Sequence, residues 1–426
     1  MLRVCTPSHW SLRCHTLHSS AGQDIAILSQ WRHELASNSK APNNFVCLCT
    51  SEAVNWKTLS SDRVVKVAKA NAMPLNVPLL APFTIASTKL EHVQNVAIRV
   101  ELSDGSIGWG ESPTLPPVTA EDQQAALSAA SLTCGLLEQN SDMSSHQLFT
   151  FVGSTLPGHR FASVRAGVEM ALIDAIAHCA GVSLWQFFGG SSNHVITDIT
   201  IPICNPEEAA ALAGSYALRG FDTLKVKVGG RSIEADITML KAIRRSHPEC
   251  SLILDANGGY DADEALDFLK LLDDACLTPA LFEQPVPRDD WKGLGEVNRK
   301  AKEMYGVSVA ADESCRNLLD AEIIIKEQLA EVVNIKLAKS GVMGAMEIVT
   351  AVKNAGLNLM IGGMVETRLA MGFAAHFAAG LGCFKFIDLD TPLLLSRDPI
   401  HDGYEVQGPK YILDNCEGHG GWLSWP

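Results

Sequence analysis

The feature of this sequence that most restricts its fold is a series of short apolar runs that each end in a charged residue. The runs cover residues 224–227, 252–255, 280–283, 309–312 and 333–336. Their charged ends are 28, 28, 29 and 24 residues apart. A parallel strand reaches its neighbour through a crossover of a dozen or more residues, usually a helix. Strand–helix units repeated at this period predict a (β/α)-barrel.

The repeat extends to eight candidate strands. They cover residues 195–201, 222–228, 251–255, 280–284, 307–312, 332–337, 357–362 and 383–388. Helix starts fall between them, because Asn205 precedes Pro206 as an N-cap and Asp261 with Glu264 has the spacing of a capping box. Eight units within about 195 residues leave little room for a complete barrel. We therefore expect the last helix to be missing or replaced.

The segments that precede the repeat predict a mixed α and β unit. Residues 64–70, 93–102 and 107–111 have strand patterns, and residues 82–90 have the composition of a loop. Residues 119–181 have helical patterns. These elements predict an α+β cap that precedes the barrel.

We therefore predict an α/β fold in which a modified (β/α)-barrel catalytic domain spans 191–390. An α+β capping domain with its lead-in helices spans 63–190, and the C-terminal segment 391–426 packs back on that cap. Residues 1–62 form a separate N-terminal segment.

This N-terminal segment has an unusual composition. Residues 1–23 contain no acidic residue but contain two arginines among several serines and histidines. Such a composition is typical of an organellar transit peptide, and a disordered tail is the alternative. We predict location in the chloroplast, with the mitochondrion or the cytoplasm as alternatives.

Charge and hydropathy exclude two classes of partner. The formal net charge is −14 and no basic run of five or more residues is present, which argues against a nucleic-acid surface. No uncharged apolar stretch reaches the 18 residues of a membrane span. The 12 cysteines form no CxxC pair and are interpreted as reduced thiols. We expect a small-molecule partner, and association of identical copies stays open.

The charged strand ends predict a catalytic site. In a strand, residues two apart point to the same side, so Lys225 and Lys227 both face the barrel mouth. Asp255, Glu283 and Asp312 end three successive strands. Each carboxylate alone is compatible with a helix cap or a solvated loop, but three together repel one another unless a cation lies between them. A hard divalent cation with oxygen ligands, such as Mg²⁺, meets this need.

Lys336 ends the next strand, so the predicted metal lies between two strand-borne lysines. A substrate carboxylate on Mg²⁺ would have one lysine on each face of its α-carbon. The α-proton then leaves to one lysine and returns from the other through a stabilised enediolate. This order predicts 1,1-proton transfer, in which Lys227 and Lys336 are the acid/base residues.

In their order, these segments resemble the enolase superfamily, and within it the muconate-lactonizing-enzyme subgroup. The resemblance runs from about residue 74 to 395. The segments that carry it are Lys225-Val226-Lys227, Asp255-Ala256-Asn257, Phe282-Glu283-Gln284-Pro285, Ala311-Asp312-Glu313-Ser314 and Asn334-Ile335-Lys336. The resemblance implies metal ligands at the three carboxylates and acid/base roles for Lys227 and Lys336. It also implies that Lys225 acts near the substrate carboxylate and that cap loops close over the substrate.

The eighth strand bears on the substrate. Asp388 and Asp390 share a strand face and precede Pro392-Leu393. This pair looks like that of dipeptide epimerases, where it holds the α-ammonium group. The sequence is therefore interpreted as a Mg²⁺-dependent dipeptide epimerase that converts L-Ala-L-X to L-Ala-D-X.

Other interpretations stay open. Asp388 and Asp390 could instead fix loop amides at the barrel rim. The subgroup also contains cycloisomerases, o-succinylbenzoate synthases and N-acylamino acid racemases, and a silent scaffold would retain the same fold.

One position departs from the bacterial L-Ala-D/L-Glu epimerases, in which an arginine of the first cap loop binds the glutamate side chain. Thr88 stands at that position here, and Lys89 follows it. We assign both residues to the substrate site and predict broader tolerance, with Ala-X dipeptides as the core set.

Overall fold

The computed structural model describes residues 64–84, 89–116, 118–140 and 142–425. The predicted transit peptide and Thr88 lie outside the described residues. No helix in these ranges is long and apolar enough to cross a membrane.

The predicted strand repeat forms one parallel sheet in chain order. Its strands are β7 (Ile199–Ile201), β8 (Thr223–Lys227), β9 (Ser251–Asp255), β10 (Leu281–Glu283), β11 (Ser308–Ala311), β12 (Val332–Ile335), β13 (Asn358–Ile361) and β14 (Phe384–Ile387). Each strand pairs with the next, from β7 at one edge to β14 at the other. The described residues contain no strand ladder between these two edges, although the Asp198 amide donates to the Ile387 carbonyl at 3.0 Å.

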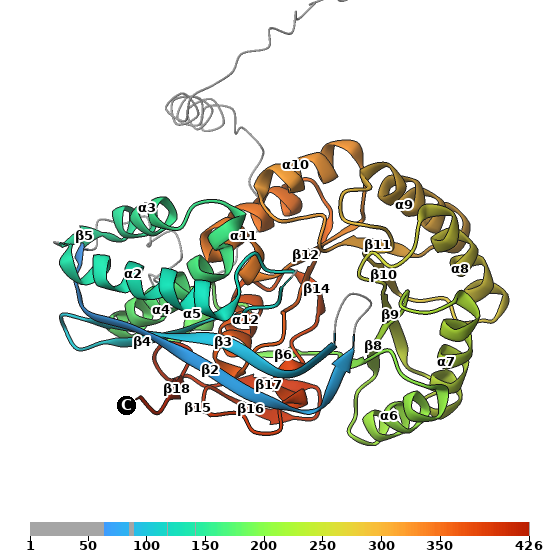
Figure 1. Ribbon diagram of the computed structural model, residues 1–426, viewed down its shortest axis with the longest axis horizontal. Coiled ribbons are helices and arrows are strands. Elements are labelled where there is room, and N and C mark those ends of the chain that lie inside the picture. The colour runs from blue at the N-terminus through green and yellow to red at the C-terminus, as the bar shows by residue number, and fades with distance from the viewer. Residues whose placement is uncertain (1–63, 85–88, 117, 141, 426) are drawn as a thin grey trace, which may run out of the picture. The chain divides into compact units, whose positions relative to one another are not determined.

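A helix follows each of the first seven strands. The helices are α6 (Pro206–Leu218), α7 (Ile233–Ser246), α8 (Ala262–Asp274), α9 (Trp291–Tyr305), α10 (Leu318–Glu327), α11 (Leu337–Asn354) and α12 (Arg368–Leu381). Figure 1 shows the sheet curled, with α6 to α10 around its outside. Asn205 and Asp261 cap α6 and α8 as predicted. The short 3-10 helix η3 (Thr391–Leu394) replaces an eighth α-helix, so the modified barrel is confirmed.

The inside of the sheet is filled in layers. Five successive strands each contribute one residue to a buried apolar cluster, which consists of Ile253, Leu281, Ala310, Val332 and Met360. Because alternate strand residues point to the same side, the residue two positions further on also faces inward. These residues are Asp255, Glu283, Asp312, Asn334 and Gly362. The polar site therefore lies directly above an apolar layer.

The cap is a three-stranded antiparallel sheet covered by helices. Its elements are β2 (Val67–Thr84), β3 (Lys89–Leu102), β4 (Ile107–Ser112), α2 (Gln123–Gln139), α3 (Ser145–Thr155), η2 (His159–Phe161), α4 (Ala162–Ala180) and α5 (Leu184–Phe187), with β1 (Val64–Val65) paired to β5 (Met143–Ser144). The prediction of a loop over 82–90 is wrong at its ends. Backbone pairing of Phe83 with Leu90 and of Thr84 with Lys89 extends β2 and β3 into this region.

Glycine allows α4 to lie directly on β4. A Cβ atom at Gly110 would come within 2.0 Å of the Gly167 carbonyl oxygen. Overpacking of this kind costs about 1–3 kcal/mol. We expect Gly110→Ala to lower the free energy of unfolding by that amount in a denaturant titration. Gly135→Ala is the matched control, since nothing lies within 4 Å of its Cβ position in α2; equal losses in the two variants would contradict this account.

The C-terminal segment returns to the cap and to the barrel edge. It contains β15 (Ile400–Asp402), β16 (Tyr404–Gln407), β17 (Lys410–Leu413) and β18 (Gly421–Leu423). Leu395, Ile400 and Leu423 join a buried cluster with Leu75 and Val77 of β2. The tail thus shares an apolar core with the cap.

The first predicted strand, 195–201, is two strands in the structure. Its beginning is β6 (His194–Ile196), which pairs with β17 in the tail sheet. Only Ile199–Ile201 enters the barrel. The chain changes sheet at Asp198 because the amide of this residue bonds to β14.

Candidate active site

Lys225 is the centre of a buried ion-pair network. Its side chain is 1% exposed and points from β8 into the barrel. Nζ donates to Asp388 Oδ2 at 2.6 Å. It also lies 2.8 Å from Glu283 Oε2 and 3.1 Å from Asp255 Oδ2. Carboxylates from β9, β10 and the end of β14 therefore converge on one point.

Lys227 and Lys336 lie on opposite sides of the mouth. Lys227 belongs to β8 and Lys336 follows β12, four positions further along the eight-stranded sheet. Lys227 Nζ donates to Asp255 Oδ2 at 2.5 Å, and Lys336 Nζ donates to Asp312 Oδ2 at 2.6 Å. The three carboxylates at the C-terminal ends of β9, β10 and β11 fill one arc between the lysines. The other arc contains Asp388.

These contacts shift the pKa values of the carboxylates in different directions. Burial favours the neutral acid, but Lys227 and Lys225 outweigh it and lower the pKa of Asp255 to about 2. Burial similarly opposes ionisation of Asp312, yet Lys336 and Lys339 hold its pKa well below the usual range. Burial and the neighbouring Asp255 raise the pKa of Glu283 to about 7. Of the three carboxylates, Glu283 is thus the one whose negative charge its surroundings stabilise least.

A small cavity of about 40 Å³ lies in the mouth. Lys225, Lys227, Lys336, Asp388 and Asp390 all line it. The structure therefore brings together the two predicted acid/base lysines and the predicted ammonium-binding pair. The three predicted metal ligands lie just beneath, joined to these lysines by the ion pairs.

Asp390 and Asp388 belong to a larger acidic group at the seam of the sheet. Asp390 Oδ2 accepts from the Thr200 amide at 2.6 Å, whereas its Oδ1 has no hydrogen-bond partner. Asp198 was not indicated by any sequence pattern. It is 3% exposed, and neither of its carboxylate oxygens has a hydrogen-bond partner. Burial, followed by Asp388 and Asp390, raises the pKa of Asp198 well above its usual value.

Comparison with known proteins identifies the family of this chain. The N-terminal domain of mandelate racemase / muconate lactonizing enzyme matches residues 68–189, and the enolase C-terminal domain-like family matches residues 208–424. The chain belongs to the mandelate racemase/muconate lactonizing enzyme family.

Named relatives are epimerases. A protein of Populus trichocarpa named L-Ala-D/L-amino acid epimerase is 59% identical over 87% of this chain and 88% of its own length. An aromatic dipeptide epimerase of Herpetosiphon aurantiacus is 39% identical over 82% of this chain and 97% of its own. A dipeptide epimerase of Enterococcus faecalis, solved with Mg and L-Leu-L-Tyr, has a TM-score of 0.78 and 31% identity, and the match covers 84% and 99% of the two chains. The predicted membership of the enolase superfamily and the isomerase class are confirmed.

In this family member, buried carboxylates and buried lysines are interspersed in and beneath the mouth. Its buried carboxylates are Asp198, Asp255, Glu283, Asp312, Asp388 and Asp390, and its buried lysines are Lys225, Lys227, Lys336 and Lys339. Among the described residues, no three His, Cys, Asp or Glu side chains are already arranged around a metal position. Lysine ammonium groups lie between the carboxylates instead.

The residues nevertheless fit a divalent cation. Glu283 Oε2 is buried and has only the ion pair with Lys225, without a hydrogen bond. Asp255, Glu283 and Asp312 offer carboxylate oxygens, which are the ligands that Mg²⁺ prefers. These three residues could hold the ion.

Several residues near the site were not identified from the sequence. Asn334 Nδ2 donates to Glu283 Oε1 at 2.7 Å, and the period-2 pattern before Lys336 could have indicated it. Lys339 contacts Asp312 and lies one helical turn after Lys336, a spacing that the sequence displays. Asn257 Nδ2 donates to Glu313 Oε1 at 3.1 Å at the cavity edge.

Apolar residues of the cap cover the mouth. Leu115 packs in a buried cluster with Ala338 and Met364 of the barrel, and Leu90 and Val118 pack against it. The cap thus reaches the site through the segment after β4 as well as through β3. The predicted substrate contact at Thr88 lies outside the described residues, as does the side chain of Lys89, so both stay predictions.

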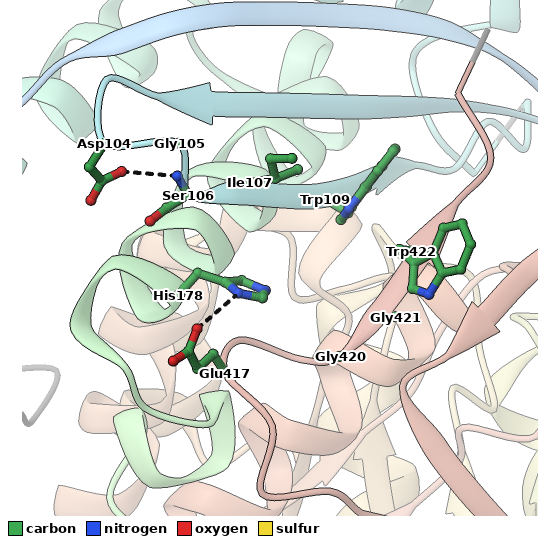
Figure 2. A pocket seen from close by; sticks show the side chains of 10 residues that line it. All are labelled: Asp104, Gly105, Ser106, Ile107, Trp109, His178, Glu417, Gly420, Gly421 and Trp422. Atoms are coloured by element: carbon green, nitrogen blue, oxygen red, sulfur yellow. Dashed lines mark hydrogen bonds and ion pairs between the residues drawn. The ribbon is translucent and has the colours of Figure 1, made fainter.

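A larger cavity of the described residues lies elsewhere. It holds about 610 Å³ between the turn after β3, the end of α4 and the C-terminal tail. Figure 2 shows His178 facing Glu417 there, with Nδ1 and Oε2 3.9 Å apart. None of the lysines and carboxylates of the mouth lines it. Cavity size therefore does not indicate the site in this protein, whereas buried charge does.

Proposed function

We propose that this protein epimerises dipeptides with a free α-ammonium group at the α-carbon of the C-terminal residue. One observation carries the proposal: Lys227 and Lys336 face one cavity from opposite sides, and Asp388 and Asp390 line the same cavity. Two proton carriers on opposite faces suit inversion of a stereocentre. The paired carboxylates suit a cationic group at the other end of a dipeptide, where the α-ammonium nitrogen lies four bonds from that stereocentre.

The polarity of the mouth orients such a substrate. Its ammonium group would face Asp388 and Asp390, and its carboxylate would face the Mg²⁺ that Asp255, Glu283 and Asp312 would hold. Lys225 lies between these two regions, with contacts to Asp388 and Glu283. The α-carbon of the second residue then lies between Lys227 and Lys336.

The reaction needs one proton to leave and one to enter. One lysine, as the neutral amine, accepts the α-proton, and the electron pair of the C–H bond moves into the carboxylate as an enediolate. The other lysine, as the ammonium, donates a proton to the opposite face, so the configuration inverts. Mg²⁺ held by Asp255, Glu283 and Asp312 would stabilise the negative charge on the enediolate oxygens. Two observations support Mg²⁺: the buried Glu283 Oε2 without a hydrogen bond and the Mg-bound E. faecalis relative.

The apolar cover has a role in this chemistry. Leu115 and Met364 line the cavity, and both are buried. Exclusion of water strengthens the electrostatic interactions within the site.

The free ammonium group provides the test of this function. We expect L-Ala-L-X dipeptides to epimerise and their N-acetyl derivatives to react at least about 100-fold more slowly, since a lost charge pair costs roughly 3 kcal/mol. Chiral chromatography after incubation with Mg²⁺ measures both. In Asp388→Asn, the rates for dipeptides and for their N-acetyl derivatives should differ less. Turnover of N-acylated substrates at equal rates would favour an N-acylamino acid racemase instead.

The first cap loop bears on the range of second residues that the site would accept. Thr88 offers no positive charge to an acidic side chain, and the name of the P. trichocarpa relative contains no single second residue. We propose a range of Ala-X substrates. A panel of Ala-X dipeptides in which only Ala-Glu reacts would contradict this breadth.

We also propose that residues 1–62 direct the protein to a plastid. Support comes from the acid-free, serine-containing start and from the plant origin of a relative that is 59% identical. A fluorescent fusion of residues 1–62 in plant cells tests this location.

A further inference from the structure

Lys339 is a buried lysine that the proposed reaction does not use. It is 5% exposed and lies in the first turn of α11. It does not line the mouth cavity, so it does not touch a substrate there. It lines an adjoining cavity instead, on the other side of Glu313.

Its ammonium group joins two strands of the barrel. Nζ donates to Asp312 Oδ1 at 2.6 Å, to the Asp312 carbonyl at 2.5 Å and to the Asn334 carbonyl at 3.1 Å. These three acceptors use all the protons of a lysine ammonium group. Asp312 follows β11, and Asn334 belongs to β12 two residues before Lys336.

The bridge lies where the strand ladder ends. β11 and β12 pair only at Ala310 with Val332 and at Ala311 with Val333. Beyond these pairs, no register holds Asp312 beside Asn334. Besides the Lys336–Asp312 ion pair, Lys339 therefore supplies a second connection between the strand that bears a proposed metal ligand and the strand that bears a proposed base.

The two oxygens of Asp312 are divided between two lysines. Lys339 binds Oδ1 and Lys336 binds Oδ2. Lys336 has to leave Oδ2 to reach an α-carbon, and Lys339 then remains as a fixed partner of the carboxylate. This division keeps Asp312 oriented while Lys336 moves a proton.

The turn that carries both lysines is itself anchored to the cap. α11 has a kink at Gly341, where φ is 78°. Arg165 of α4 donates to the Ser340 carbonyl at 3.0 Å, and Glu169 of α4 accepts from the Met343 amide at 3.1 Å. Residues 337–340 are thus held between α4 and β12.

We propose that Lys339 is a positioning residue that holds Asp312 and Lys336 in register across the gap between β11 and β12. The functional part of this inference rests on the proposed epimerase activity. Lys339 differs in this role from Lys336, which acts on the substrate.

Deuterium exchange at the α-carbon provides a readout that is specific for position. Each epimer of one dipeptide is incubated with Mg²⁺ in D₂O, and the initial rate of exchange is measured by proton NMR. Lys336→Ala identifies the epimer whose proton Lys336 removes. We expect Lys339→Met to slow exchange of that epimer by about 10–100-fold, as for other groups that orient site residues. Exchange of the other epimer, which depends on Lys227, should fall less.

Lys353→Met is the matched control, because Lys353 is exposed in the last turn of the same helix. It should leave both exchange rates unchanged. Equal losses for both epimers in Lys339→Met, or no loss in either, would overturn the positioning role.

Thermal unfolding tests the inference without activity. Loss of Lys339 leaves Asp312 with one lysine instead of two. Without metal, Lys339→Met should therefore melt at a lower temperature than the unmodified protein. Mg²⁺ should raise the melting temperature of the variant by more than it raises that of the unmodified protein. A deficit that Mg²⁺ does not reduce would indicate a packing role and overturn the proposal.

Lys339→Gln provides a second variant, since its amide retains a donor without the charge. If neither variant folds with Mg²⁺ present, Lys339 serves packing and the proposal is wrong. If no dipeptide exchanges with the unmodified protein, the proposed function fails, and the melting experiment still decides the role of Lys339.

Discussion

Lys336→Ala is expected to abolish epimerisation while exchange of the α-proton continues in one epimer. Lys227→Ala should have the same effect on epimerisation, with exchange retained in the opposite epimer. The reason is that the two lysines face the cavity from β8 and from the end of β12, so each reaches one face of the α-carbon. Loss of a general base costs roughly 10²–10⁴-fold in rate. Chiral chromatography measures epimerisation, and proton NMR in D₂O measures exchange.

Lys326→Ala is the control for these variants, since Lys326 is 81% exposed on α10. Removal of both lysines should end exchange in both epimers. If one single variant lost exchange in both epimers while it still bound Mg²⁺, a single base would carry the reaction and the two-lysine mechanism would be wrong.

Removal of one proposed metal ligand should separate activity from stability. We expect Glu283→Gln to lose at least about 100-fold in activity, since a metal ion contributes several kcal/mol to the stabilisation of charge in the transition state. The metal-free protein should not become less stable. Burial and Asp255 raise the pKa of Glu283 to about 7, so ionisation of this side chain lowers stability as the pH rises through 7. The glutamine side chain of the variant would have no such charge, and its amide oxygen could still accept from Asn334.

The measurements are Mg²⁺ titration by calorimetry and thermal unfolding at pH 5 and pH 8. The variant should gain in melting temperature over the metal-free parent chiefly at pH 8. Glu303→Gln is the control, because Glu303 is 60% exposed on α9. Unchanged Mg²⁺ affinity in Glu283→Gln would exclude Glu283 as a ligand. Chelation of the parent protein should reproduce the loss of activity, with recovery on addition of Mg²⁺.

Much of the barrel was predictable because its signal is local. An apolar run of four or five residues followed by a charged residue is visible in the sequence, and it also indicates on which face of the sheet each side chain lies, since side chains alternate along a strand. The helix starts at Asn205 and Asp261 were equally local, because a cap bonds to an amide three residues away. The split of 195–201 into β6 and β7 was not predictable, because β6 pairs with β17, more than 200 residues later.

The candidate site divides in the same way. Lys227, Asp255, Glu283, Asp312 and Lys336 each end a strand of the repeat, so their convergence follows from the fold class. Asp198 gave no signal, since its role depends on the seam between β7 and β14. The sequence displays Lys339 one helical turn after Lys336. Its contacts were not predictable, because the three oxygen atoms that it binds come from two strands.

The sequence by itself therefore determined the order of charges around the mouth: lysine, three carboxylates, lysine and an Asp pair. Period and spacing suffice for this, because a parallel barrel converts order along the chain into order around a ring. The tertiary structure decided which charges touch. It places Lys225 among Asp255, Glu283 and Asp388, and it divides the oxygens of Asp312 between Lys336 and Lys339. Such contacts depend on side-chain length, stagger between strands and burial, which only the packed barrel fixes.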